Sequence, residues 1–286
     1  MTTLWHGYSE RGLVNALFES ALSHPEGATI LARLFERAWH PPWARPDGSI
    51  REMRRTQLWP RDAKIEDAEV FIEHSLSDFG EPDALILMTA RLVSGERLTK
   101  ALMLEAKRET WSKNVRYQAK NLQQNASSIL HELFLKSRLA DYLYSPALNQ
   151  LIKTDSHPGV RVYAHDKKRY RHIGQEPMVR QLVDRLAQPA IPCFFLALTT
   201  TPNPTPEEAS RPDGWSAGLE MARDIARITL ENDITGKTTA DSVGNGWLEA
   251  TSHLSWDDVA DWAHEEGLGR MSRTLEENAT KLDRRP

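Results

Sequence analysis

The chain has 286 residues, 40% of them hydrophobic, and a formal net charge of -4. This apolar content can build the core of one large domain or two smaller ones, which argues against a disordered chain. The excess of acidic residues argues against binding nucleic acid through bulk positive charge, because such binding scales with the phosphates neutralised. Any contact with nucleic acid is therefore expected to be local.

The apolar runs and the cysteine content point to a soluble location. No apolar run approaches the roughly 20 residues that a membrane helix needs, so no membrane span is expected. The N-terminal sequence lacks the pattern of a secretion signal, and the single cysteine, Cys193, cannot form an intramolecular disulfide. We expect a cytoplasmic protein.

Hydrophobic residues recur at helical spacing near the N-terminus. They predict a helix at residues 9–22, with Ser9 as its N-cap, and a second helix at residues 28–39. The segment 40–61 is rich in proline and arginine and is expected to be a loop.

Two apolar segments, 83–88 and 101–107, are expected to pair as a hairpin, because a polar, glycine-bearing turn at 93–96 separates them. Residues paired across an antiparallel ladder have numbers with a constant sum, and a turn centred near Gly95 gives a sum of about 188 to 190. Asp83 then lies opposite the stretch that begins at Glu105.

The rest of the chain predicts more helices and strands. A long helix is expected at about residues 111–143 and another at 176–186, with strands at 160–164 and 193–199. Prolines and a Pro-Asp-Gly turn then break the pattern, and the remaining sequence is expected to be helical and charged.

The break suggests a division of the chain. We expect a core at residues 1–201 and a C-terminal helical region at residues 213–286, which is able to pack on the core as one domain.

The charged end of the hairpin is the strongest candidate for chemistry. Strand alternation places Glu105 and Lys107 on the same face, and the predicted register brings Asp83 beside them. Phosphodiester cleavage uses divalent cations that prefer carboxylate oxygens, and a lysine can meet the water or phosphate. The alternative for Glu105 and Lys107 is a charge pair on an edge strand, and for Asp83 a turn acid after proline.

Two further polar residues face the same region by helical angle. Glu10 lies in line with the apolar stripe of the first helix, although an acid in a first turn is also favoured by the helix dipole. Gln118 lies at the edge of the stripe of the long helix, where a surface glutamine is the ordinary interpretation.

Pro82-Asp83 together with Glu105-Ala106-Lys107 resembles the PD-(D/E)xK, or restriction-endonuclease-like, nuclease superfamily. The resemblance covers roughly residues 9–200 in the order of elements: helix, strands, helix, strand. It implies an α/β fold with a mixed sheet of about four to five strands flanked by helices, here followed by the C-terminal helical appendage. It also implies that Glu10 and Gln118 join the site.

On this resemblance, Asp83, Glu105 and the backbone carbonyl of Ala106 would bind Mg²⁺ or Mn²⁺. Lys107 would orient the attacking water and offset charge on the phosphate, and Glu10 would complete the metal shell or hold a second ion. The expected activity is magnesium-dependent hydrolysis of DNA, with duplex favoured over single strands.

The spacing of an acid and a lysine is a weak signal by itself. Asp62-Ala63-Lys64 and Asp166-Lys167-Lys168 also fit the loose pattern, but the first has no preceding apolar strand and the second no hairpin partner with an acid. The histidines lack metal-ligand spacing, and no glycine-rich phosphate loop is present.

Other functions stay open from the sequence. One alternative is an RNA nuclease, and another is a non-catalytic module with the nuclease fold that docks a helicase or ATPase partner. A homodimer is also compatible with the sequence. The presence of Asp83, Glu105 and Lys107 together favours the enzyme.

Overall fold

The structure is a computed structural model of the chain. It describes residues 10–40, 54–72, 82–108, 177–187, 191–200 and 250–278. It also describes seven helical residues between positions 129 and 140: Ile129, Glu132, Leu133, Lys136, Ser137, Leu139 and Ala140. The predictions for Ser9, for Gln118, for the strand at 160–164 and for most of the helix at 111–143 lie outside the described residues.

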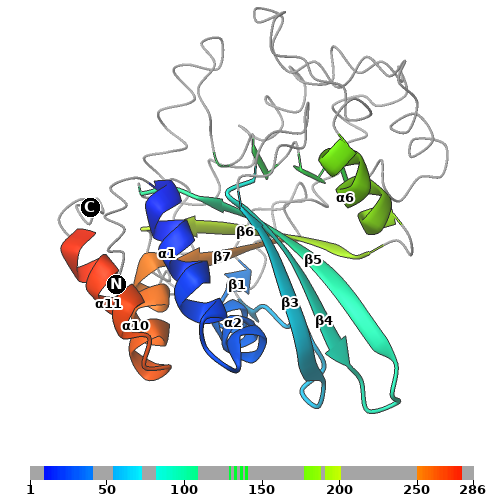
Figure 1. Ribbon diagram of the computed structural model, residues 1–286, viewed down its shortest axis with the longest axis horizontal. Coiled ribbons are helices and arrows are strands. Elements are labelled where there is room, and N and C mark those ends of the chain that lie inside the picture. The colour runs from blue at the N-terminus through cyan, green and yellow to red at the C-terminus, as the bar shows by residue number, and fades with distance from the viewer. Residues whose placement is uncertain are drawn as a thin grey trace, which may run out of the picture.

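A mixed sheet of seven strands forms the centre of the described fold, in the order β2-β1-β7-β6-β5-β4-β3 (Figure 1). Its strands are β1 (Trp39–His40), β2 (Arg54–Arg55), β3 (Lys64–Ile72), β4 (Ala84–Arg91), β5 (Arg97–Ala106), β6 (Cys193–Thr199) and β7 (Thr251–Ser255). Strands β3, β4 and β5 are antiparallel, and β6 and β7 continue parallel to β5. The predicted α/β class is confirmed, with more strands than expected.

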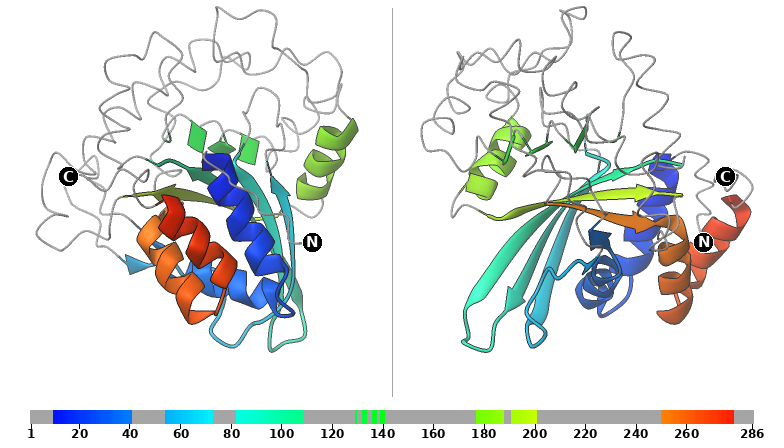
Figure 2. Two further views of the ribbon diagram at one scale, coloured as in Figure 1. Left: turned by 60° about the vertical axis from the view of Figure 1, so that its left-hand side comes forward. Right: turned by 180° about the vertical axis from the view of Figure 1, so that it is seen from behind.

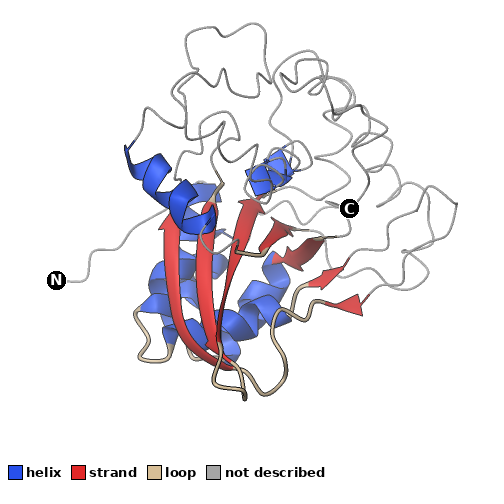
Figure 3. Ribbon diagram, turned by 90° about the vertical axis from the view of Figure 1, so that its right-hand side faces the viewer, coloured by secondary structure: helices blue, strands red, loops and turns tan. Residues whose placement is uncertain are grey.

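Helices cover both faces of this sheet unequally (Figures 1 and 2). On one face lie α1 (Glu10–Leu22), α2 (Gly27–Glu36), α10 (Trp256–Glu265) and α11 (Gly269–Asn278). The helix α6 (Pro177–Ala187) lies over the opposite face, where Arg185 forms an ion pair with Glu69. Figure 3 shows the strands edge to edge with the N- and C-terminal helices behind them.

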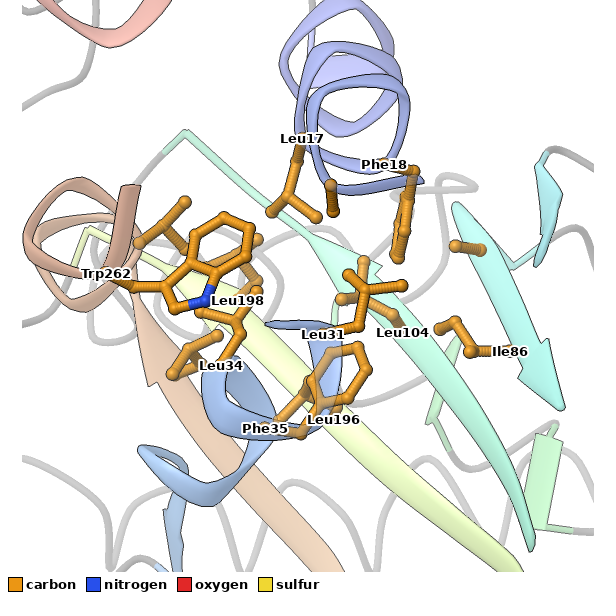
Figure 4. Packing of buried hydrophobic residues seen from close by; sticks show 14 of the residues in the cluster. Leu17, Phe18, Leu31, Leu34, Phe35, Ile86, Leu104, Leu196, Leu198 and Trp262 are labelled. Carbon is orange, nitrogen blue, oxygen red and sulfur yellow. The ribbon is translucent and has the colours of Figure 1, made fainter. Parts of the chain in front are cut away.

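The core is built by strand alternation on the helix-covered face. Even-numbered residues of β4, β5 and β6 point toward α1, α2 and α10, as Figure 4 shows for Ile86, Leu104 and Leu196. Opposite them lie Leu17 and Phe18, Leu31, Leu34 and Phe35, and Trp262. Each such buried side chain contributes about 1.5–3 kcal/mol through removal of apolar surface from water.

The hairpin of β4 and β5 has the predicted register. Ala84 pairs with Leu104 and Arg91 with Arg97, so the numbers of paired residues sum to 188 along the ladder. The turn is closed by Gly95, whose φ of 86° suits glycine because it has no Cβ. The open end of the hairpin therefore brings Asp83 beside Glu105.

The strand β3 was not predicted from the sequence. Its register shifts between Ile65 and Asp67, which marks a β-bulge at Glu66. Because of the bulge, Ile65 and Val70 both pack toward the core although their numbers differ in parity. The extra residue breaks the period-two pattern that identifies a strand, and the Glu66 side chain pairs with Arg91 and Arg97 at the surface.

The expectation of a purely helical C-terminal region is corrected by β7, which lies between β6 and β1 in the sheet. Its sequence, TSHLS, lacks apolar alternation, yet the whole strand is buried. Ser255 ends β7 and caps α10, since its hydroxyl accepts from the Asp258 amide at 3.0 Å and the Asp258 carboxylate accepts from the Ser255 amide at 3.0 Å. Helices α10 and α11 add Trp262 and Leu275 to the core.

Candidate active site

The site lies at the end of β5, where two acids from other elements bind its backbone. The amide of Ala106 donates to Asp83 Oδ2 at 2.7 Å, and the amide of Arg108 donates to Glu10 Oε1 at 3.0 Å. Asp83 precedes β4 directly, and Glu10 is the first residue of α1. One carboxylate oxygen of each acid thus fixes the side chain against the strand end.

The residue between these two amides is held by two further elements. The Lys107 amide donates to the Leu198 carbonyl of β6 at 2.8 Å. The Lys107 carbonyl accepts from Trp256 Nε1 of α10 at 3.1 Å, and Trp256 is buried. Both backbone polar groups of Lys107 therefore have partners, which orients its side chain.

Glu105 lies on the face of β5 that points away from α1 and α2. The residue is 1% exposed, and its Oε1 atom forms an ion pair with the ammonium of Lys136, which is 0% exposed. Lys136 belongs to the helical residues between 129 and 140. Burial of two charges is costly, so the pairing is what makes it tolerable.

Glu132 connects this pair to Lys107. Its Oε2 atom lies 2.9 Å from Lys107 Nζ, and the two side chains are 20% and 12% exposed. The Glu132 carboxylate also interacts electrostatically with Glu105 and Lys136, and each of these residues affects its pKa or is affected by it. Glu105 and Lys107 therefore meet the same residue, as expected for two residues on one face of a strand.

The two acids from the hairpin hold their protons more tightly than usual. Burial raises the pKa of Asp83, partly opposed by its hydrogen bond from Ala106. Burial also raises the pKa of Glu105 well above its ordinary value, against the attraction of Lys136 and with the repulsion of Glu132. A cation placed between these acids would therefore compete with protons.

The pKa shifts of Glu132 and Lys107 favour their ionised forms. Burial alone would raise the pKa of Glu132, but Lys107 and Lys136 outweigh it and the net pKa is lowered. Burial would lower the pKa of Lys107, but the charges of Glu132 and Glu105 outweigh it and the net pKa is raised. An ammonium held this firmly is a donor and a positive charge, and does not act as a base.

The structure brings together most residues predicted for the site. Asp83, Glu105, Lys107 and Glu10 gather at the end of β5. The Ala106 amide binds Asp83, while the predicted role of its carbonyl in metal binding stays a prediction. Gln118 lies outside the described residues.

Glu132, Lys136 and Trp256 also contact the site, and they were not predicted from the sequence. Lys136 follows Ile129 by seven positions and Leu133 by three, so helical spacing places it on the apolar side of the long helix. The comparison of helical angles that predicted an inward-facing Glu10 would also have predicted an inward-facing Lys136. No local pattern signals the contact of Trp256, because its partner lies 149 positions away.

The donor chemistry suits a hard divalent cation, since carboxylate oxygens are the preferred ligands of Mg²⁺. Access of a cation to the Glu105 carboxylate is restricted, because the Lys136 ammonium lies against it. Within the described ranges, no group of three or more His, Cys, Asp or Glu side chains is placed to hold a metal ion. Likewise no described helix is long and apolar enough to cross a membrane.

Comparison of the chain with protein-family models, with curated proteins and with solved structures finds no match.

Proposed function

We propose that the protein is a magnesium-dependent nuclease that cleaves DNA. The observation that carries the proposal is the convergence of Asp83, Glu105 and Lys107 at the end of β5. An acid pair with a lysine is the set of groups that phosphodiester hydrolysis with a metal ion uses.

The free-energy cost of burying the charges of Glu105 and Lys136 supports a chemical role for this cluster. Glu105 and Lys136 are buried among apolar strands, and well-packed hydrophobic residues in place of a buried ion pair are often neutral or stabilising. The fold alone therefore does not require charges here. The order of the elements, with helices α1 and α2, then strands β1 to β5, then helical residues and β6, follows the order helix, strands, helix, strand that the resemblance to PD-(D/E)xK nucleases implies.

Each residue has a role in the proposal. Asp83, Glu105 and the Ala106 carbonyl would hold Mg²⁺, which when bound polarises the phosphate. Lys107 would donate a hydrogen bond to the attacking water or to a phosphate oxygen and offset the charge that grows there. Glu10 fixes the end of β5 through Arg108 and keeps a second oxygen for the metal shell or a second ion.

A second candidate function is a non-catalytic module that binds a nucleic-acid-processing partner. One observation favours it: each of the acids already has a partner within the protein, a backbone amide for Asp83 and Glu10 and an ammonium for Glu105. A purely structural cluster would look the same without substrate.

The test is cleavage of supercoiled, linear and single-stranded DNA and of RNA, with and without Mg²⁺. We expect DNA cleavage that depends on Mg²⁺, lowered at least about a thousandfold by Asp83→Asn or Lys107→Met. Asp62→Asn and Lys64→Met are matched controls, because these exposed residues have the same spacing outside the site. They should cleave like the wild type.

Four results would contradict the proposal. Full activity of Asp83→Asn or Lys107→Met would show that these residues do not have the assigned catalytic roles. Cleavage without a metal would exclude a metal-dependent mechanism. Binding of nucleic acid without cleavage supports the non-catalytic module, and cleavage of RNA alone replaces the substrate.

A further inference from the structure

We propose that Glu132 and Lys136 form a charge-exchange pair that keeps Lys107 engaged until a divalent cation binds. This inference rests on the proposed function, because it concerns the same cluster. In the exchange, the ammonium of Lys136 would move from Glu105 to Glu132 when Glu105 takes up a cation, and Glu132 would then release Lys107. Glu132 and Lys136 are positioning residues in this scheme, since they act through Lys107 and Glu105.

The first step follows from the partners of the acids. Asp83 and Glu10 each bind a backbone amide, at 2.7 and 3.0 Å, and such donors need not move when a cation approaches the other oxygen. Glu105 instead binds the ammonium of Lys136, a positive charge in the place that a cation would take. A divalent ion and this ammonium therefore compete for the same carboxylate.

The second step follows from the helix that carries both residues. Glu132 and Lys136 are four positions apart, a spacing that places side chains about 5–6 Å apart on one face of a helix. Glu132 already feels the Lys136 charge while its Oε2 atom lies 2.9 Å from Lys107 Nζ. The displaced ammonium thus has an acceptor one turn away and need not reach water.

The third step concerns the release of the Lys107 ammonium from Glu132. With Lys136 on Glu105, Glu132 is the main counter-charge of Lys107. With Lys136 on Glu132, that carboxylate is shared between two ammonium groups and its hold on Lys107 weakens. Lys107 becomes available to a phosphate only when the cation is in place, which couples the two requirements of the reaction.

The first experiment measures cation affinity by calorimetry with Mn²⁺ and Mg²⁺ on the full chain. Lys136→Met should bind about tenfold more tightly, because an internal competitor lowers the fraction of binding-competent molecules in the wild type. Glu132→Gln should bind more weakly, since the displaced ammonium loses its acceptor. In the double variant the effect of Glu132→Gln should vanish. Lys100→Met is the control: this lysine is also partly buried, 4.9 Å from the Trp59 ring, outside the cluster.

The second experiment follows Lys107 directly, and its deciding result comes from the wild type alone. The acetylation rate of Lys107, read by mass spectrometry and divided by that of exposed Lys64, should rise severalfold with Mg²⁺ in the wild type. The rise should be absent in Lys136→Met. A ratio that Mg²⁺ leaves unchanged in the wild type overturns the exchange, even if Lys136→Met does not fold.

The results separate this inference from the proposed function. A wild type that binds no divalent cation and cleaves nothing removes the nuclease proposal. A wild type that binds Mg²⁺ and cleaves DNA, while Lys136→Met binds it equally or more weakly, removes the charge exchange alone.

Discussion

Glu105 and His253 stand in one row of the sheet, two strands apart, with Ala197 between them. Both residues are almost completely buried, at 1% and 0% exposure, but their surroundings differ. His253 hydrogen-bonds the Thr199 hydroxyl at 2.8 Å and lies against the Trp39 ring, 5.0 Å between centroids. Glu105 is placed against the ammonium of Lys136.

The difference shows where the fold tolerates charge. Burial lowers the pKa of His253 to about 3, so the ring is neutral, and its described partners include the Thr199 hydroxyl and the Trp39 ring. Around Glu105 the fold gathers Lys136, Glu132 and Lys107. Neutral polar groups are buried cheaply once hydrogen-bonded, whereas paired charges rarely repay their desolvation. The charged end of the row is therefore the end where chemistry is expected.

The largest expected effect is on DNA cleavage, and it distinguishes Glu105 from His253. Glu105→Gln keeps the shape of the side chain and removes its charge, so Mg²⁺-dependent cleavage should fall at least about a thousandfold. His253→Gln retains a hydrogen-bonding group for Thr199, so cleavage should stay within about threefold of the wild type. Initial rates below the melting temperature of both variants measure this. Equal losses would place the two residues in one site.

The next effect concerns stability. Lys136→Met leaves the Glu105 carboxyl buried without its counter-ion and should lower the free energy of unfolding by about 3 kcal/mol. The double variant Glu105→Leu with Lys136→Met removes both charges and should recover most of this loss. Urea unfolding of both variants gives the comparison. A double variant as unstable as the single one would mean that the pair stabilises the fold.

The pH dependence of the free energy of unfolding tests whether the buried His253 is neutral in the folded protein. Since the pKa of His253 is lowered from 6.5 to about 3 in the folded protein, the unfolded chain takes up its proton first as pH falls. The contribution of His253 to stability is then fully present above pH 6.5 and declines below it, by up to about 1.4 kcal/mol per pH unit. In His253→Gln this part of the decline should be missing between pH 6.5 and about 5. His264→Gln, at an exposed position of α10, should decline like the wild type.

The smallest effect is expected for charges outside the buried row. Arg33 of α2 and Glu266 form an ion pair at 2.8 Å with side chains 50% and 15% exposed. Arg33→Met should cost no more than about 1 kcal/mol, and less at high salt, because solvent screens such pairs. Thermal unfolding at low and high salt checks this. A cost equal to that of Lys136→Met would show that burial does not set the difference.

Much of the fold could be predicted because its signals are local. A turn centred near Gly95 predicted a hairpin sum of about 188 to 190. The observed sum of 188 lies in this range and places Asp83 beside Glu105. Helical spacing gave α1 and α6, and an apolar run gave β6 with its observed bounds. These features depend on residues that are neighbours in sequence, where turn geometry and side-chain periodicity act directly.

Other features were decided by tertiary structure. The bulge at Glu66 disguises β3, and β7 becomes a strand because β6 and β1 offer it hydrogen-bonding edges, although its own sequence has no strand pattern. Here the sheet supplies what local propensity does not, since strand preference depends on the surrounding packing.

The sequence by itself determined that Asp83, Glu105 and Lys107 meet, because one tight turn fixes their register. Only the tertiary structure decided what surrounds them: Lys136 on Glu105, Glu132 on Lys107, and Trp256 on the Lys107 carbonyl. These contacts join elements separated by long stretches of chain. Their geometry depends on how whole layers pack, and no short-range pattern records it.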